Sequence, residues 1–287
     1  MMNERIKVEK PTSQKIAKFS YKAFVIIFIA VVLLLTYIPI LVMAINSIST
    51  DPMGYRFTGL TFDWYSKLLA GGELTDSIVF TLEITFLSTI ISTIFGTASA
   101  IGINSLNRNA RKKFIILNNV PILNADIVTA AFLLILFQII SLMIGTNIIS
   151  QYGFITTLIA HVLFSTPYVV LSVLPKLGKD NSIYDAAIDL GCSPAQALFK
   201  VIIPNIKAGI FSGALLAFTM SIDDFIITYF VSGANDNFST WLYGSLKQIK
   251  SGAWPQACAY NTLLMVITFT AIIVYQLLSK KKKKVTE

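Results

Sequence analysis

Two adjacent aspartates, Asp223 and Asp224, interrupt an otherwise uncharged stretch that covers residues 208–232. A carboxylate near the middle of a bilayer costs about 2.5–3.5 kcal/mol, so acids inside apolar segments usually face a cavity or a pathway. On one continuous helix, Ser221, Asp224 and Thr228 would share a face, at the spacings i, i+3 and i+7. The pattern predicts a site that attracts cations, with Asp224 as the first candidate to contact one.

Aromatic residues accompany these acids, since Phe225 and Tyr229 follow them on the same segment. Flexible polycations suit carboxylates and aromatic rings together, through charge and cation–π attraction. An alternative stays open, in which the acidic pair caps a helix or forms a salt bridge inside a subunit interface. Glu83 and Asp126 are weaker candidates for the same pathway, because either could lie near a membrane face.

The other reactive side chains point to no catalytic centre. His161 is expected to hydrogen-bond to a neighbouring helix rather than to transfer protons. Cys192 and Cys258 do not have the spacing of metal ligands. An intramembrane aspartyl protease would need aspartates on separate helices with a Gly-x-Gly-Asp-like signature, and the sequence has none. We therefore expect no enzyme activity, no metal and no cofactor on this chain.

The composition indicates an integral membrane protein. Of the 287 residues 55% are hydrophobic and 13% are charged, the mean hydropathy is +0.70, and soluble domains carry about 25% charged residues. A spanning helix needs about 20 mostly apolar residues. Six such segments are present, with a polar, glycine-containing turn at residues 145–153 between the third and the fourth. The predicted spans are residues 23–45, 77–107, 127–144, 154–175, 208–232 and 254–279.

The basic residues predict the orientation. Cytoplasmic loops carry an excess of Lys and Arg, and placing both ends inside leaves four basic residues outside: Arg56, Lys67, Lys247 and Lys250. The net charge of +8 is confined to short clusters, which argues against nucleic acid as a partner. We expect a basic cytoplasmic amino terminus (1–22), a six-span permease domain (23–279) and a basic cytoplasmic tail (280–287).

The longest inner connection, residues 175–207, predicts two helices in succession. Ser182 opens the first, and Gly191 ends it because glycine adopts the left-handed conformation cheaply. Ser193 and Pro194 open the second with a capping box, and Pro204 is expected to end it.

This loop resembles the EAA motif of ABC importer permeases. That motif reads Glu-Ala-Ala, three residues, Gly, nine residues and Ile-x-Leu-Pro, and Asp185 here replaces the usual Glu. The positions that match in type and spacing are Ala186, Ala187, Gly191 and Pro204. The resemblance implies an all-α membrane protein with six transmembrane helices of the type I ABC importer permease (MetI-like) fold. It also implies that residues 185–204 are the coupling helix that docks onto a cytoplasmic ATPase.

Three further segments look like PotC-type permeases of spermidine/putrescine importers: residues 124–128, 171–177 and 218–233. The resemblance implies half of a translocation pathway, completed by a second, PotB-like permease. An ABC ATPase dimer would bind the ATP and Mg, and an extracytoplasmic polyamine-binding protein would deliver the substrate. An importer permease for another substrate, a metal cation or an amino acid, stays open as the alternative.

Aromatic residues gather in the two longer outer loops. Either they face the binding protein or they form a belt at the membrane interface. They are Phe57, Phe62, Trp64, Tyr65, Trp241, Tyr243 and Trp254.

Overall fold

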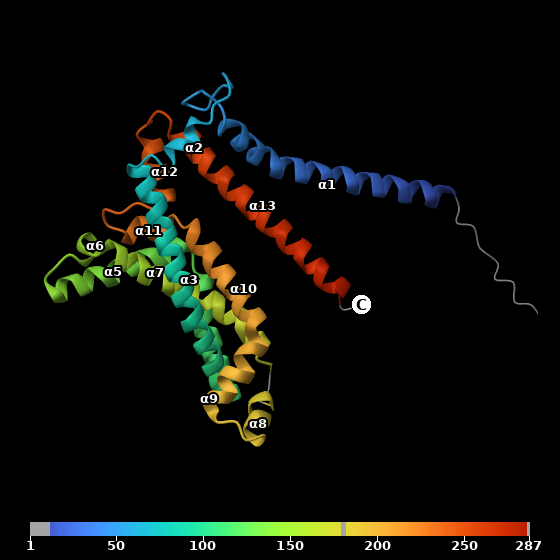
Figure 1. Ribbon diagram of the computed structural model, residues 1–287, viewed down its shortest axis with the longest axis vertical. Helices are drawn as coiled ribbons and strands as arrows, with labels where there is room; N and C mark the ends of the chain where they lie inside the picture. Colours follow the sequence, from blue (N-terminus) through green and yellow to red (C-terminus); the bar gives the residue numbers. More distant parts are fainter. Residues whose placement is uncertain (1–11, 179–181, 286–287) are drawn as a thin grey trace, which may run out of the picture. The chain divides into compact units, whose positions relative to one another are not determined.

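A computed structural model describes residues 12–178 and 182–285, which fold as helices and loops (Figure 1). Among these residues the one extended pairing is an isolated bridge between Ser49 and Leu60. The chain divides into two compact units, Met1–Leu69 with Lys250–Glu287, and Ala70–Ile249.

The first unit contains α1 (Thr12–Asn46), the short α2 (Asp63–Lys67) and α13 (Ala253–Val285). The loop between α1 and α2 is held by the indole of Trp64, which donates a hydrogen bond of 2.7 Å to the carbonyl of Ser49. The backbone N–H of Gly252 donates to the carbonyl of Pro52 over 2.9 Å, so the start of α13 is tied to the loop that follows α1.

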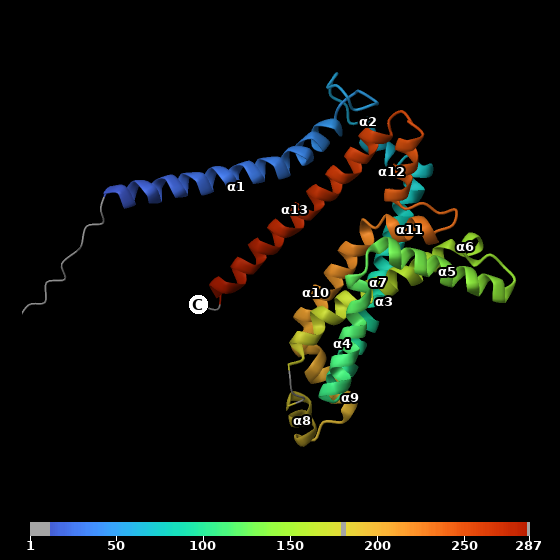
Figure 2. The same ribbon diagram turned by 180° about the vertical axis from the view of Figure 1, so that it is seen from behind.

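Three helices form the core of the second unit: α3 (Glu73–Ser105), α7 (Gly153–Val173) and α10 (Ile203–Ile222), which contact one another pairwise (Figure 2). Seven of the ten buried residues of α3 are small, a composition that lets helix backbones approach closely in membranes. A Cβ atom on Gly96 would lie 2.6 Å from the Cβ of Val169 on α7. The buried small residues of α3 are Ser77, Thr81, Thr85, Ser88, Ser92, Gly96 and Ala100.

Shorter elements complete this unit. In both views α8 and α9 lie at the end of the unit opposite α11 and α12 (Figures 1 and 2). The elements are α4 (Arg108–Leu123), α5 (Asp126–Ile144), α6 (Ile148–Gln151), α8 (Ser182–Asp189), α9 (Pro194–Gln196), α11 (Ile226–Val231) and α12 (Phe238–Lys247).

Five helices of the described residues are long and apolar enough to cross a membrane. Four of them coincide with the first four predicted spans, and the fifth overlaps the fifth predicted span over residues 208–222. The five are Phe24–Asn46, Glu73–Ser105, Asp126–Ile144, Gly153–Lys176 and Pro194–Ile222. The sixth predicted span, residues 254–279, lies on the continuous helix α13. The all-helical membrane fold is confirmed, whereas the domain boundaries stay a prediction.

The fifth predicted span is not one continuous helix to Ser232. Helix α10 ends at Ile222, and α11 starts at Ile226. Asp224 accounts for the break, because its carboxylate accepts backbone N–H groups of α11 and so competes with continuation of the preceding helix.

The prediction that Pro204 ends the second helix of the inner loop was wrong. A π-helical segment, Ala197–Ile202, joins α9 directly to α10, and Pro204 lies in the first turn of α10. The N–H of Ile203 bonds to the carbonyl of Leu198, five residues back. Proline lacks an N–H and clashes with the carbonyl of an α-helical ladder, so a continuous helix accommodates it where that ladder is irregular, as it is in the π-helical segment just before Pro204.

Helix α4 was not predicted, and it lies between the second and the third predicted spans. Asn107 caps this helix by accepting a hydrogen bond of 2.9 Å from the N–H of Ala110. An asparagine at this position is a usable N-cap signal. The helix was not predicted because the basic residues from Arg108 to Lys113 give its start no apolar pattern.

Candidate functional site: a polar cluster at a helix break

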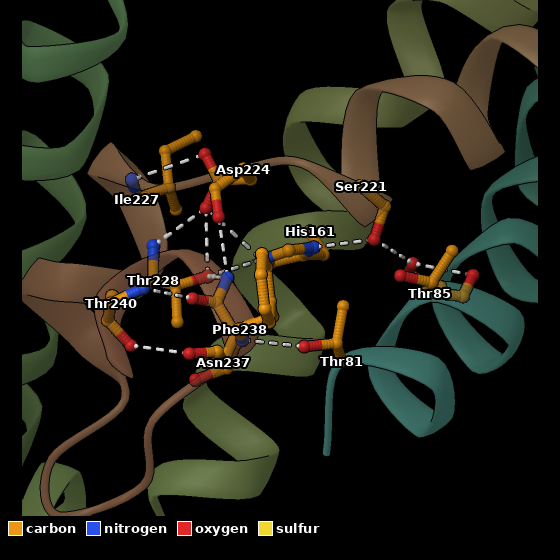
Figure 3. Close-up of polar contacts among 12 residues, drawn as sticks. Thr81, Thr85, His161, Ser221, Asp224, Ile227, Thr228, Asn237, Phe238 and Thr240 are labelled. Atoms are coloured by element: carbon orange, nitrogen blue, oxygen red, sulfur yellow. Dashed lines mark hydrogen bonds and ion pairs between the residues drawn. The ribbon is translucent and has the colours of Figure 1, made fainter. Parts of the chain in front are cut away.

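Asp224 lies in the break between α10 and α11 and caps α11 (Figure 3). One carboxylate oxygen accepts the N–H of Ile227 at 3.3 Å. The other accepts both the N–H and the hydroxyl of Thr228, each at 2.8 Å. The side chain of Asp224 is only 9% exposed, so its charge is satisfied inside the fold.

His161 on α7 joins the two sides of this break. Its Nδ1 lies 2.7 Å from the hydroxyl of Ser221, in the last turn of α10. Its Nε2 lies 3.0 Å from the hydroxyl of Thr228 and 3.5 Å from Asp224 Oδ2. The expectation that His161 hydrogen-bonds to neighbouring helices is confirmed.

The hydrogen bonds of Thr228 determine which ring nitrogen of His161 carries a hydrogen. The Thr228 hydroxyl gives its single hydrogen to Asp224, so it can only accept from the other polar groups around it. His161 Nε2 must therefore carry the hydrogen that it shares with Thr228. On the other side of the ring, the hydroxyl of Ser221 lies 3.0 Å from the hydroxyl of Ser88 on α3, so the hydrogen-bond network extends to that helix.

Asn237 closes the cluster from the loop before α12. Its amide nitrogen donates to the carbonyl of Asp224 over 2.5 Å and to the hydroxyl of Thr228 over 3.2 Å. Its amide oxygen accepts the N–H of Thr240 at 2.8 Å and thereby caps α12. Asn237 carried no signal in the sequence beyond its position in a loop.

The other predicted pathway residues lie outside this cluster. Asp223 is exposed, and within residues 12–178 and 182–285 its carboxylate accepts no hydrogen bond from another residue. Tyr229 is 55% exposed. Asp126 lies in the exposed first turn of α5, and Glu83 is exposed on α3.

Tyr229 belongs to an aromatic group in which Tyr243 joins the two rings, of Phe225 and Tyr229, that the sequence had placed beside the acids. Its ring centroid lies 5.6 Å from that of Phe225 and 6.0 Å from that of Tyr243, which comes from α12. The rings of Phe225 and Tyr243 are 5.2 Å apart. The helix break therefore brings rings from two helices together directly after Asp223.

Glu83 lines a separate cavity of about 610 Å³. Four carboxylates border it, those of Glu73, Asp76, Glu83 and Asp236, and no lysine or arginine is among its lining residues. Phe80, Phe154 and Trp241 contribute to its walls. A cavity of this charge attracts cations.

The predicted coupling segment has the helix–turn–helix form that its sequence indicated. Gly191 follows α8 with φ of +87°, and the capping box joins Ser193 and Gln196, each bonding the other's backbone. Asp185 and Ala186 are exposed, whereas Ala187 is buried. The predicted capping role of the Ser182 side chain lies outside the described residues.

Two tryptophans of the loops that were predicted to lie outside are buried. Trp64 and Trp241 are each 7% exposed, so neither can present its ring to a partner. The reason at Trp64 is the bond of its indole to Ser49, with the ammonium of Lys67 4.3 Å from the ring centroid. Phe57 and Phe62 are exposed.

Comparison with known proteins supports a transport role. The model of the family described as "Binding-protein-dependent transport system inner membrane component" matches residues 94–284. Over 255 residues the chain is 31% identical to the spermidine/putrescine transport system permease protein PotC of Haemophilus influenzae, which covers 88% of this chain and 95% of that protein. Over 251 residues it is 30% identical to the putrescine transport system permease protein PotI of Escherichia coli, covering 86% and 88%.

Solved structures agree on the fold. A bacterial ABC transporter involved in the import of the acidic polysaccharide alginate matches with a TM-score of 0.65 at 14% identity, over 91% of this chain and 98% of that chain. The same kind of transporter in complex with an alginate-bound periplasmic protein matches with a TM-score of 0.67 at 15% identity, over 91% and 94%.

Proposed function

The chain belongs to the family of binding-protein-dependent transport system inner membrane components, and on that premise we propose that it carries spermidine and putrescine across the membrane. It is a transport subunit and not an enzyme, as its relatives are permease proteins. It is a multi-pass membrane protein whose transport system includes a binding protein.

The observation that carries the polyamine assignment is the similarity to PotC and PotI over nearly the whole chain. The acidic character of the polar sites agrees with it. Polyamines are flexible polycations. The cavity offers four carboxylates and has no lysine or arginine among its lining residues. Asp223 offers a further, exposed carboxylate. Anionic substrates would be repelled by these groups.

The pathway of this chain runs past its acidic and aromatic residues. We assign to it the residues that the sequence singled out: Asp223, Asp224, Thr228, Tyr229, Glu83 and Asp126. Glu83 would act at the acidic cavity, and the others at or near the helix break and the start of α5.

The partners proposed for the complete importer are a second, PotB-like permease, an ABC ATPase dimer and an extracytoplasmic polyamine-binding protein. This chain itself binds no cofactor, and ATP with Mg belongs to the ATPase. The coupling residues are Asp185, Ala186, Ala187, Gly191 and Pro204, with both chain ends on the cytoplasmic side of the cell membrane.

Uptake of labelled spermidine and putrescine tests this function. Cells that carry the permease with its cognate partners should import both, and a Gly191→Arg variant that reaches the membrane should not. A Gly102→Ala variant serves as the control, because no atom lies within 4 Å of a Cβ at that position. If the wild type with its partners imports neither polyamine, the substrate assignment is wrong, and a metal cation or an amino acid becomes the leading alternative.

A further inference from the structure

We propose that the two neighbouring aspartates have separate tasks: Asp224, positioned by His161, holds the helix break, and Asp223 contacts an ammonium group of the substrate. The sequence favoured Asp224 for substrate contact. This inference rests on the proposed polyamine function and refines its site.

The Asp224 carboxylate is already engaged within the fold. Its two carboxylate oxygens accept three hydrogen bonds from Ile227 and Thr228 and lie beside His161. An ammonium group would compete with these donors and weaken the cap of the first turn of α11. The carboxylate is also nearly inaccessible, with 9% of its side chain exposed.

His161 fixes the geometry of the break because its ring has polar atoms on opposite sides. Nδ1 contacts Ser221 at the end of α10, and Nε2 contacts Thr228 on α11. The side chain is 1% exposed, so it acts through Asp224 and Thr228 and does not contact the substrate. It is therefore a positioning residue.

Asp223 has the opposite surroundings. It is exposed, and its carboxylate accepts no hydrogen bond from another residue in the described part of the chain. The rings of Phe225, Tyr229 and Tyr243 follow the break, and those of Tyr229 and Tyr243 are 55% and 47% exposed. A carboxylate and exposed aromatic faces are the two groups that bind a primary ammonium in water-accessible sites.

The experiment uses the complete importer in proteoliposomes. ATP is supplied on the side of the membrane where the ATPases lie, and the binding protein delivers labelled spermidine on the other side. The variants are Asp223→Asn, Asp223→Glu, Asp224→Asn and His161→Gln, each with its KM, its maximal rate and its thermal unfolding temperature. Asp223→Asn should raise KM about tenfold, because a charge-assisted bond to the substrate is lost, and should leave the unfolding temperature unchanged. Asp223→Glu should restore most of the affinity.

Asp224→Asn and His161→Gln should lower the maximal rate and the unfolding temperature and leave KM within about twofold of the wild type. A variant that carries both changes should have a maximal rate no lower than that of the more severe single variant, since both changes break one hydrogen-bond network. A raised KM with normal stability in Asp224→Asn, or an unchanged KM in Asp223→Asn, overturns the division of tasks while polyamine uptake stands. Absence of uptake in the wild type overturns the polyamine function together with this inference.

Discussion

The backbone N–H of Phe238 donates a hydrogen bond of 2.8 Å to the side-chain oxygen of Thr81. This buried bond joins the first residue of α12 to α3 across 157 positions of sequence. We expect Thr81→Val to destabilise the protein by about 1–3 kcal/mol, because a buried N–H loses its acceptor. Thermal unfolding of the purified protein in detergent measures the loss.

A matched control lies on the same helix. The Thr97 hydroxyl oxygen is buried and has no hydrogen-bond partner among the described residues, so Thr97→Val should leave stability unchanged or raise it slightly. Equal destabilisation by both substitutions would show that the bond between Thr81 and Phe238 contributes nothing specific.

The close contact between α3 and α7 depends on Gly96. Because the added Cβ of Gly96→Ala would lie 2.6 Å from the Cβ of Val169, the helices must move apart, and we expect a loss of about 1–3 kcal/mol. Gly102→Ala on the same helix meets no atom within 4 Å and should stabilise by about 0.4–1 kcal/mol, since alanine has the higher helix propensity. Unfolding temperatures that move in the same direction for both variants would contradict this packing account.

Gly191 requires glycine for its backbone conformation, with φ of +87°. A β-branched residue is strongly disfavoured there, whereas asparagine is tolerated in the left-handed region. Gly191→Val should therefore lower polyamine uptake and binding-protein-stimulated ATP hydrolysis far more than Gly191→Asn, at equal amounts of protein in the membrane. No contact of a side chain at this position explains such a difference, because a Cβ would meet no atom within 4 Å.

Asp51 makes the stability of the loop that follows α1 depend on pH. Backbone N–H groups of Met53, Arg56 and Tyr55 bond to its carboxylate, and with the Arg56 charge they lower the pKa of Asp51 below 3.8. Because the folded pKa is depressed, the stabilisation is complete above the unfolded pKa and disappears as the pH falls through the folded value.

The difference in unfolding temperature between the wild type and Asp51→Asn should therefore be constant from neutral pH down to about pH 5 and should shrink below about pH 4. Circular dichroism melts over this range measure it. A difference that grows with acidity would have the wrong sign for a lowered pKa.

Local signals made much of this protein predictable. A run of about 20 apolar residues identifies a spanning helix wherever it packs, because the lipid solvent acts on each segment separately. The turn at Gly145 and the capping box of Ser193 and Gln196 were predictable because each is local. The residues that form each feature lie within one or two turns of each other.

The sequence by itself determined the positions of the first four apolar spans, the turn at Gly191 with the capping box that follows it, and the presence of an acidic pair at residues 223 and 224. Only the tertiary structure decided that the two acids have different surroundings, with Asp224 buried beside His161 and Asp223 exposed. The partners that distinguish them, His161 and Asn237, come from other elements. The hydrogen bonds that the Asp224 carboxylate accepts are local, from Ile227 and Thr228, but its burial and its contact with His161 depend on which segments the fold brings beside it.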